Sequence, residues 1–200
     1  GAPRLESTQA RPIFDAGHLR GLEVEKKNPA TEILENFMIA AHPVTARYLV
    51  AKNFPSIRRV VRTPKRWDRI VELAQALGQT LPVNANSVAL DAFLVKEQAA
   101  DPARFPDLSL AVVKALGAGE YVLEEPGQSS IGHFGLAVRD YAHSTAPNRR
   151  FPDLITHRLV KAALAGGKPP YSTDELSELA RHCTKAEDGA NKVERKVRKA

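Results

Sequence analysis

The chain has 200 residues, of which 43% are hydrophobic and 26% are charged, proportions ordinary for a globular protein with one buried core. Its net charge of +6 and its pI near 9.5 favour partners that carry phosphate, although surplus charge often serves solubility alone. The single cysteine, Cys183, excludes an internal disulfide framework and a multi-cysteine metal site, and it fits a reducing compartment. No apolar run approaches the roughly 20 residues that span a bilayer, so we expect a cytoplasmic protein without a membrane segment.

The first 27 residues predict a strand or hairpin segment around the turn "DAGHLRG". A helix is expected next, over residues 28–53, because Asn28 is a good N-cap and Pro29 is favourable at the first helical position. Pro43 should bend or interrupt this helix. Steps of three and four residues predict one apolar stripe along it, made of Ile33, Phe37, Ala41, Val44 and Tyr48.

The middle of the chain mixes short strands with helices. The expected elements are, in order, a strand at 56–63, helices at 64–78, 86–99 and 105–117, and strands at 120–125 and 133–141. Gly78 suits the position just after the end of the first of these helices. Trp67 belongs to the apolar face of the same helix, which favours a place in the core over a role as a ligand platform.

Two helices are expected in the last part, at residues 147–167 and 172–200. Pro152 must fall in the first turn of the earlier helix. Ser172 and Glu175 form a capping-box pattern at the start of the later one, which Gly189 should interrupt. The layout predicts an α+β fold that is predominantly helical, with a few β-strands packed against the helices.

Residue patterns alone do not indicate a self-sufficient catalytic centre. The sequence contains no P-loop, no GxGxxG turn, no G-x-S-x-G elbow and no HExxH motif. Its aspartates are scattered, whereas metal-dependent phosphoryl chemistry normally needs a cluster of carboxylates. The acidic neighbours Glu124–Glu125 and Glu187–Asp188 are expected to be solvated surface.

The stretch "YAHSTAPNRRFPDLITHR" concentrates positive charge at the expected start of a helix. If that helix begins near Asn148, then Arg149, Asp153 and His157 lie on one face. A cation in the first turn is disfavoured by the helix dipole, by up to roughly 1 kcal/mol, unless an anion compensates. One interpretation is therefore a phosphate or carboxylate clamp. An Arg149–Asp153 surface ion pair explains the spacing equally well.

Residues 132–164, "GHFGLAVRDYAHSTAPNRRFPDLITHRLVKAAL", closely resemble the C-terminal signature of the ribonuclease II family catalytic domain, the RNB domain. That signature reads roughly H-F-G-L, then Y-x-x-x-T-[SA]-P-x-R-[RK], then D and H-R. Upstream, "ILENFMIAAHPVTARYL" resembles the family helix [IL]-[VI]-E-E-x-M-x-x-A-N, with Asn36 in place of the second glutamate and His42 in place of the asparagine. The resemblance runs from about residue 11 to the end of the chain.

The resemblance implies a 3′→5′ exoribonuclease that degrades single-stranded RNA to nucleoside 5′-monophosphates by Mg²⁺-assisted hydrolysis. By motif, Arg149 matches a catalytic arginine at the scissile phosphate, and Arg150 matches an auxiliary phosphate contact or a support. Glu35 matches a carboxylate near the 3′-terminal nucleotide, with a structural carboxylate as the alternative. The other motif positions expected to contact the RNA or shape its channel are His133, Tyr141 and Thr145. His157 is expected to be structural.

The family's metal-binding pattern, D-x-x-x-x-x-D-x-D-D, has no match in this sequence, so the Mg²⁺ ligands are expected outside this chain. Together with Gly1 in place of a starting methionine, this leads us to interpret residues 1–200 as the C-terminal portion of an RNB domain. Such a chain would be active only with the remaining, aspartate-bearing half as its partner. The alternative, from another functional class, is a catalytically inactive RNB-like module that binds RNA or serves as a scaffold.

Overall fold

The structure, a computed structural model, describes residues 10–15, 18–24 and 28–197. Its elements are β1 (Ala10–Asp15), β2 (His18–Val24), α1 (Pro29–Ala51), β3 (Ser56–Val60), α2 (Trp67–Ala76), α3 (Ser87–Ala100), α4 (Phe105–Leu116), β4 (Glu120–Glu124), the 3₁₀ turn η1 (Phe134–Leu136), α5 (Phe151–Leu164) and α6 (Thr173–Val197). This content confirms the predicted α+β, predominantly helical class. The chain forms two compact units, which are described separately. The first comprises Gly1–Asn36, Thr63–Gly117 and Gly135–Ala137, and the second comprises Phe37–Arg62, Ala118–Phe134 and Val138–Ala200.

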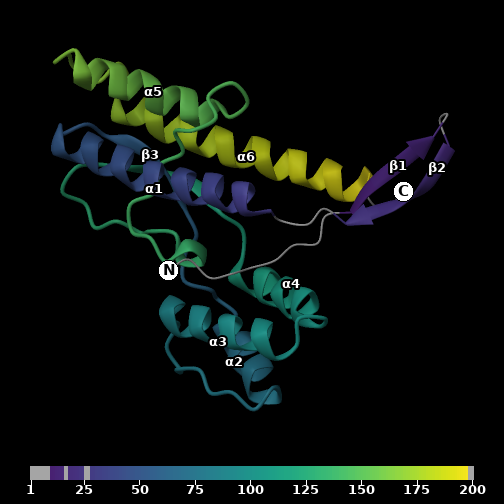
Figure 1. The fold of residues 1–200 in the computed structure, drawn as a ribbon. Coiled ribbons are helices and arrows are strands. Elements are labelled where there is room, and N and C mark those ends of the chain that lie inside the picture. The colour runs from purple at the N-terminus through teal and green to yellow at the C-terminus, as the bar shows by residue number, and fades with distance from the viewer. Residues whose placement is uncertain (1–9, 16–17, 25–27, 198–200) are drawn as a thin grey trace. The chain divides into compact units, whose positions relative to one another are not determined.

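The first unit contains the antiparallel β1–β2 hairpin and a cluster of the helices α2, α3 and α4 (Figure 1). Trp67 is 6% exposed, and its indole N–H donates to the Pro82 carbonyl at 2.8 Å, which confirms its predicted place in the core. Gly78 follows the end of α2 with a φ of 71°, as predicted. The N–H groups of Gly78 and Gln79 donate back to carbonyls of the last turn, so this end of α2 is closed by a Schellman motif.

The second unit is built on the antiparallel pair β3–β4, which α5 and α6 pack against. Figure 1 shows α5 and α6 lying side by side. The core between these elements consists of Leu49, Phe54, Ile57, Tyr121, Ile155, Leu159, Ala163, Leu176, Ala180 and Cys183. Burying each large apolar side chain in such a core stabilises the fold by roughly 1.5–3 kcal/mol before entropy is counted.

β3 also carries a buried arginine, Arg58, which is 1% exposed. Its Nη2 donates to the Ala46 carbonyl at 3.1 Å, and its Nε lies 3.5 Å from Oε1 of Glu124. Burial lowers the pKa of Arg58, while the opposite charges of Glu124 and Asp140 act to raise it. The prediction that Glu124 is solvated surface is therefore wrong, because this side chain is buried as the counter-ion of Arg58.

The helix starts that depend on local sequence agree with the predictions. The Asn28 side chain accepts the N–H of Thr31 at 2.9 Å at the start of α1. At the start of α6 the predicted capping box is present: Ser172 Oγ accepts the N–H of Glu175, and the Glu175 carboxylate accepts the N–H of Ser172. Pro152 lies in the first turn of α5.

Two predictions about breaks and strands are wrong, and a third is wrong in part. Pro43 does not interrupt α1, because the lost backbone hydrogen bond is outweighed by the burial of Ala46 and Leu49 further along the helix. The alternative, a bend at Pro43, stays a prediction. Gly189 does not interrupt α6, since one internal glycine costs only about 1 kcal/mol. The expected strand at 133–141 is instead the turn η1, flanked by an isolated bridge between His133 and Val138.

The predicted apolar stripe of α1 is not the buried face of this helix. Phe37 is 70% exposed and Val44 is 59% exposed, whereas His42, Ala46 and Leu49 are buried. The buried face is set by the distant segments that pack on α1, and these lie beyond the reach of helical periodicity. In the part of the chain that the structure describes, none of the helices combines the length and apolarity needed to cross a membrane.

Candidate functional site

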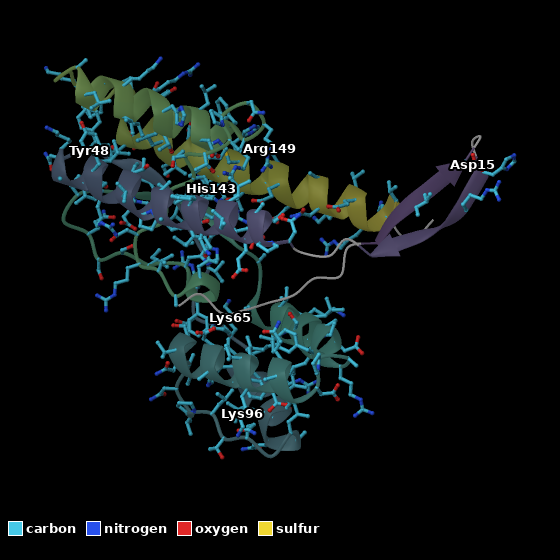
Figure 2. The ribbon with its side chains drawn as sticks, in the orientation of Figure 1. Asp15, Tyr48, Lys65, Lys96, His143 and Arg149 are labelled. Carbon is cyan, nitrogen blue, oxygen red and sulfur yellow. The ribbon has the colours of Figure 1, made fainter. Side chains whose placement is uncertain are left out.

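The candidate site lies in the second unit, on the irregular segment from Tyr141 to Arg150 that leads into α5. The segment is anchored to β3, because the Arg59 N–H donates to the Tyr141 carbonyl at 2.8 Å. Its last residues turn back on themselves, with the N–H groups of Arg149 and Arg150 both donating to the Ala146 carbonyl. We call residues 146–150 the arginine loop. Figure 2 labels His143 and Arg149 on this segment.

Asp153 fastens the arginine loop to the first turn of α5. Its side chain is fully buried, and its Oδ1 accepts the Ala146 N–H at 2.8 Å and Nη2 of Arg150 at 2.9 Å. A carboxylate in a first helical turn is also favoured by the helix dipole. Arg150 donates in addition to Oγ1 of Thr145 at 3.2 Å. The proposed Arg149–Asp153 pair is therefore wrong, since the partner of Asp153 is Arg150.

Arg149 lies two residues before α5, which begins at Phe151 and not near Asn148. The early start fails because residues 147–149 form a turn on the Ala146 carbonyl. The Arg149 side chain is exposed, and within residues 10–15, 18–24 and 28–197 it has no described ion pair or side-chain hydrogen bond. Its guanidinium therefore stands beside a helix start with all of its donors available to an anion.

Five rings from four separate segments gather behind this loop as a histidine–tyrosine cluster: His42, Tyr121, His133, Tyr141 and His143. Their centroids lie 4.8 to 5.6 Å apart, mostly edge to face, the arrangement that aromatic rings prefer. Tyr121 Oη lies 2.9 Å from Nδ1 of His143, and Nε2 of His42 lies 3.0 Å from Oγ1 of Thr145. The cluster thus supports the arginine loop from the side of β4 and α1.

The histidines of this cluster are neutral at physiological pH. Burial, followed by the charge of Arg150, lowers the pKa of His42 to about 4 and that of His143 to about 2. Burial, followed by the charge of Arg59, lowers the pKa of His133 to about 4. Burial also raises the pKa of Tyr121 to about 12. A base with a pKa this far below 7 is poorly matched to proton transfer, so the cluster is suited to holding shape and to contacting a ligand.

An ion pair that the sequence analysis missed ties the cluster to α6. The Arg59 guanidinium binds the Glu187 carboxylate with two hydrogen bonds, one of them 2.9 Å long, and lies 4.7 Å from the centroid of the Tyr121 ring. Glu187, predicted to be solvated surface, has a side chain that is 36% exposed, and the sequence did not indicate its partner. The partners are separated by 128 residues, so local patterns could not pair them. The one sequence feature that could have indicated a buried ion pair was the presence of two arginines in a short strand rich in β-branched residues.

The structure brings together most of the predicted site residues. Arg149, Arg150, Thr145, Tyr141 and His133 all belong to the second unit. Tyr141 is buried, whereas Thr145 is exposed. His157 donates to the Ser144 carbonyl at 2.6 Å, a contact within the fold. Glu35 lies half-buried on the part of α1 that belongs to the first unit.

The side chains described here do not fit a magnesium centre. Within residues 10–15, 18–24 and 28–197, no three or more His, Cys, Asp or Glu side chains come together in a group able to hold a metal ion. Hard cations take several oxygen ligands, and the buried carboxylate of Asp153 is already engaged by the arginine loop.

The family model described as the RNB domain matches residues 1–166 of this chain. The chain belongs to the RNB domain family. Ribonuclease R 1 of Lactococcus lactis subsp. lactis (strain IL1403) is 30% identical over 100% of this chain and 25% of its own length. Ribonuclease R of Escherichia coli (strain K12) is 31% identical over 98% of this chain and 25% of its own length. The chain therefore spans about a quarter of the length of these curated relatives.

Solved structures of the RNB fold are similar as well. The apo form of Mycoplasma genitalium RNase R superimposes with a TM-score of 0.82 at 20% identity, over 98% of this chain and 31% of that chain. The complex of the same enzyme with ribose methylated single-stranded RNA also gives 0.82. Yeast Ssd1, described as a pseudonuclease, gives 0.65 at 19% identity, over 76% of this chain and 19% of its own. At these identities the likeness establishes the fold.

Proposed function

We propose that this chain is the C-terminal portion of the RNB domain of a 3′→5′ exoribonuclease that degrades single-stranded RNA to nucleoside 5′-monophosphates. The observation that carries the proposal is the exposed guanidinium of Arg149, held beside the start of α5 by a loop that Asp153 fastens. A clamp of this kind stabilises negative charge that develops on a phosphate during hydrolysis. The similarity to ribonuclease R relatives supports RNA as the substrate.

In this proposal the two arginines have different tasks. Arg149 contacts the scissile phosphate, while Arg150, engaged by Asp153 and Thr145, keeps the loop in place and adds positive charge. Thr145, Tyr141 and His133 shape the path of the RNA, and Glu35 lies near its 3′-terminal nucleotide. The Mg²⁺ ligands belong to an aspartate-bearing portion outside these residues. A cytoplasmic location is part of the proposal, because the single cysteine fits a reducing compartment.

A second candidate is a catalytically inactive RNB-like module that binds RNA or serves as a scaffold. It is favoured by the lack of a metal-binding group among the described residues and by the fold likeness to a pseudonuclease. The two candidates differ in what happens when the chain is joined with a polypeptide that carries the D-x-x-x-x-x-D-x-D-D cluster. The nuclease releases nucleotides from RNA, and the inactive module binds RNA without shortening it.

The test is degradation of 5′-labelled and 3′-labelled single-stranded RNA by the chain, reconstituted with that polypeptide in the presence of Mg²⁺. We expect release of nucleoside 5′-monophosphates from the 3′ end. Arg149→Ala should lower the rate by about a hundredfold or more, the usual effect of deleting a donor at a developing charge. Arg47→Ala, at another exposed arginine of the second unit, is the matched control. Equal rates for the two variants would reject Arg149 as the phosphate clamp.

A further inference from the structure

A groove of about 440 Å³ runs along α6 beside β4, within the second unit. Three exposed cations line it, Arg181, Lys185 and Lys192, spaced so that they lie on one face of α6. Two acidic residues, Glu120 and Asp188, line it as well. The charges that face the groove therefore decide what it can hold.

These charges leave the groove positive. Glu120 is neutralised by Arg62, whose Nε lies 2.5 Å from Oε1 of Glu120. In the described part of the chain, the side chains of the three cations have no ion pair or hydrogen bond, so Asp188 alone stands against them. The alternative explanation is a solvated basic helix face, which has the same residue types but no hollow beside it. Here the cations line one side of a hollow, and the ligand they suit is an anion.

Gly189 also lines the groove. It lies inside α6, where glycine is about 1 kcal/mol less favourable than alanine. A Cβ built at Gly189 would meet nothing within 4 Å, so the packing of this chain does not demand a glycine there. The missing side chain instead leaves open space on the face of α6 between Lys185 and Lys192.

The groove borders the candidate site through Tyr121. This residue lines the groove and donates its backbone N–H to Oγ1 of Thr184 at 2.8 Å. Its hydroxyl oxygen lies 2.9 Å from Nδ1 of His143, in the segment that carries the arginine loop. Tyr121 therefore connects the groove to the segment that carries the arginine loop.

We propose that this groove binds the phosphodiester backbone of single-stranded RNA, as a second contact surface in addition to the arginine loop. The inference rests on the proposed function, because it takes RNA as the ligand. Lysine and arginine side chains that neutralise phosphates release counterions, so this surface contributes affinity that depends on salt and does not depend on sequence.

The sharpest test places a carboxylate at the open position. Gly189→Glu adds negative charge and bulk to the groove, whereas Gly189→Ala adds only a methyl group and should stabilise α6. Fluorescence anisotropy with a labelled single-stranded RNA, in EDTA to prevent cleavage, measures binding. We expect Gly189→Glu to weaken binding by about tenfold or more at low salt, because a like charge stands where phosphates lie. Gly189→Ala should bind like the unsubstituted chain.

Two double variants that remove the same charge distinguish an effect of the groove from an effect of net charge. Lys185→Gln with Lys192→Gln removes two groove cations, and Lys161→Gln with Lys168→Gln removes two exposed cations elsewhere in the second unit. Each phosphate contacted on a single strand contributes about 0.7 to the slope of log affinity against log salt. The groove variant should therefore reduce this slope by about 1.4, and the control should leave it unchanged.

Equal salt slopes for the two double variants, or equal RNA affinities for Gly189→Glu and Gly189→Ala, would overturn the proposal that the groove binds RNA. The nuclease proposal is judged separately, by RNA degradation in the reconstituted assay and its dependence on Arg149. If RNA is degraded and the groove variants bind RNA as before, the groove proposal is rejected and the nuclease proposal stands. Groove-dependent binding without any degradation supports the groove and leaves the inactive RNA-binding module as the function.

Discussion

Two neighbouring arginines illustrate how one buried carboxylate can assign different tasks to identical side chains. Asp153 takes one hydrogen bond from Arg150 and one from the Ala146 N–H, so Arg150 is committed to the fold. Arg149 is exposed and keeps its donors available. A guanidinium binds phosphate more tightly when the backbone that carries it is rigid, because less entropy is then lost on binding. Asp153 supplies that rigidity without touching the phosphate.

At this residue scale, Asp153→Ala should be strongly destabilising. It leaves the Ala146 N–H and the Arg150 guanidinium without their acceptor, and the cost of such unsatisfied groups is about 3 kcal/mol of unfolding free energy. Asp153→Asn keeps one acceptor oxygen and should cost less. Urea unfolding followed by circular dichroism measures both. If Asp153→Ala changes the unfolding free energy by less than the error of such a measurement, the fastening role is wrong.

At the scale of elements, the Arg59 side chain of β3 holds α6 through Glu187, and it leaves no room for a side chain at Gly119. The Arg59 guanidinium lies between Glu187 and the Tyr121 ring, and a Cβ built at Gly119 would come within 2.8 Å of its nitrogens. That distance is too short for a methyl carbon in non-bonded contact with a nitrogen. A side chain at Gly119, the residue before β4, would therefore displace the Arg59 guanidinium that pairs with Glu187.

Gly119→Ala should consequently displace Arg59 and weaken its pair with Glu187, at a cost of about 1 kcal/mol, since the pair is partly exposed. Glu187→Gln should cost a similar amount through the same contact. In a double-mutant cycle the two changes should then be non-additive, because the second removes an interaction that the first has already broken. Additive effects on the urea midpoint would show that Gly119 does not act through Arg59.

The elements also show what can be predicted from sequence alone. Caps were predictable, as at Asn28 and at Ser172, because the interacting groups lie three residues apart. The buried face of α1 was not, since His42 contacts Thr145, 103 residues away in the sequence, and the rings of Tyr141 and His143. The arginine loop was located by its motif. The partner of Asp153 was not, because residues 147–149 form a turn in place of the expected first helical turn, and Arg150 takes the place predicted for Arg149.

At the scale of the whole second unit, three neutral histidines in one interior cluster link folding to pH. Each of them has a lower pKa in the folded protein, about 4 for His42 and His133 and about 2 for His143, than the value of about 6.5 in an unfolded chain. Between these values the unfolded chain binds more protons than the folded one. The stabilising contribution is therefore complete above about pH 6.5. As the pH falls below that value it is lost, down to about pH 4 for His42 and His133 and to about pH 2 for His143.

The free energy of unfolding should accordingly fall with decreasing pH, by up to about 1.4 kcal/mol per pH unit for each histidine that remains neutral. Urea unfolding at a series of pH values between 5 and 8, followed by circular dichroism, gives this slope directly. His143→Gln removes one titrating ring from the cluster and should lower the slope by about one proton, and His182→Gln, at an exposed position of α6, is the control. A slope that is the same in both variants would mean that His143 is protonated in the folded state, and that burial and the positive charge of Arg150 do not keep it neutral.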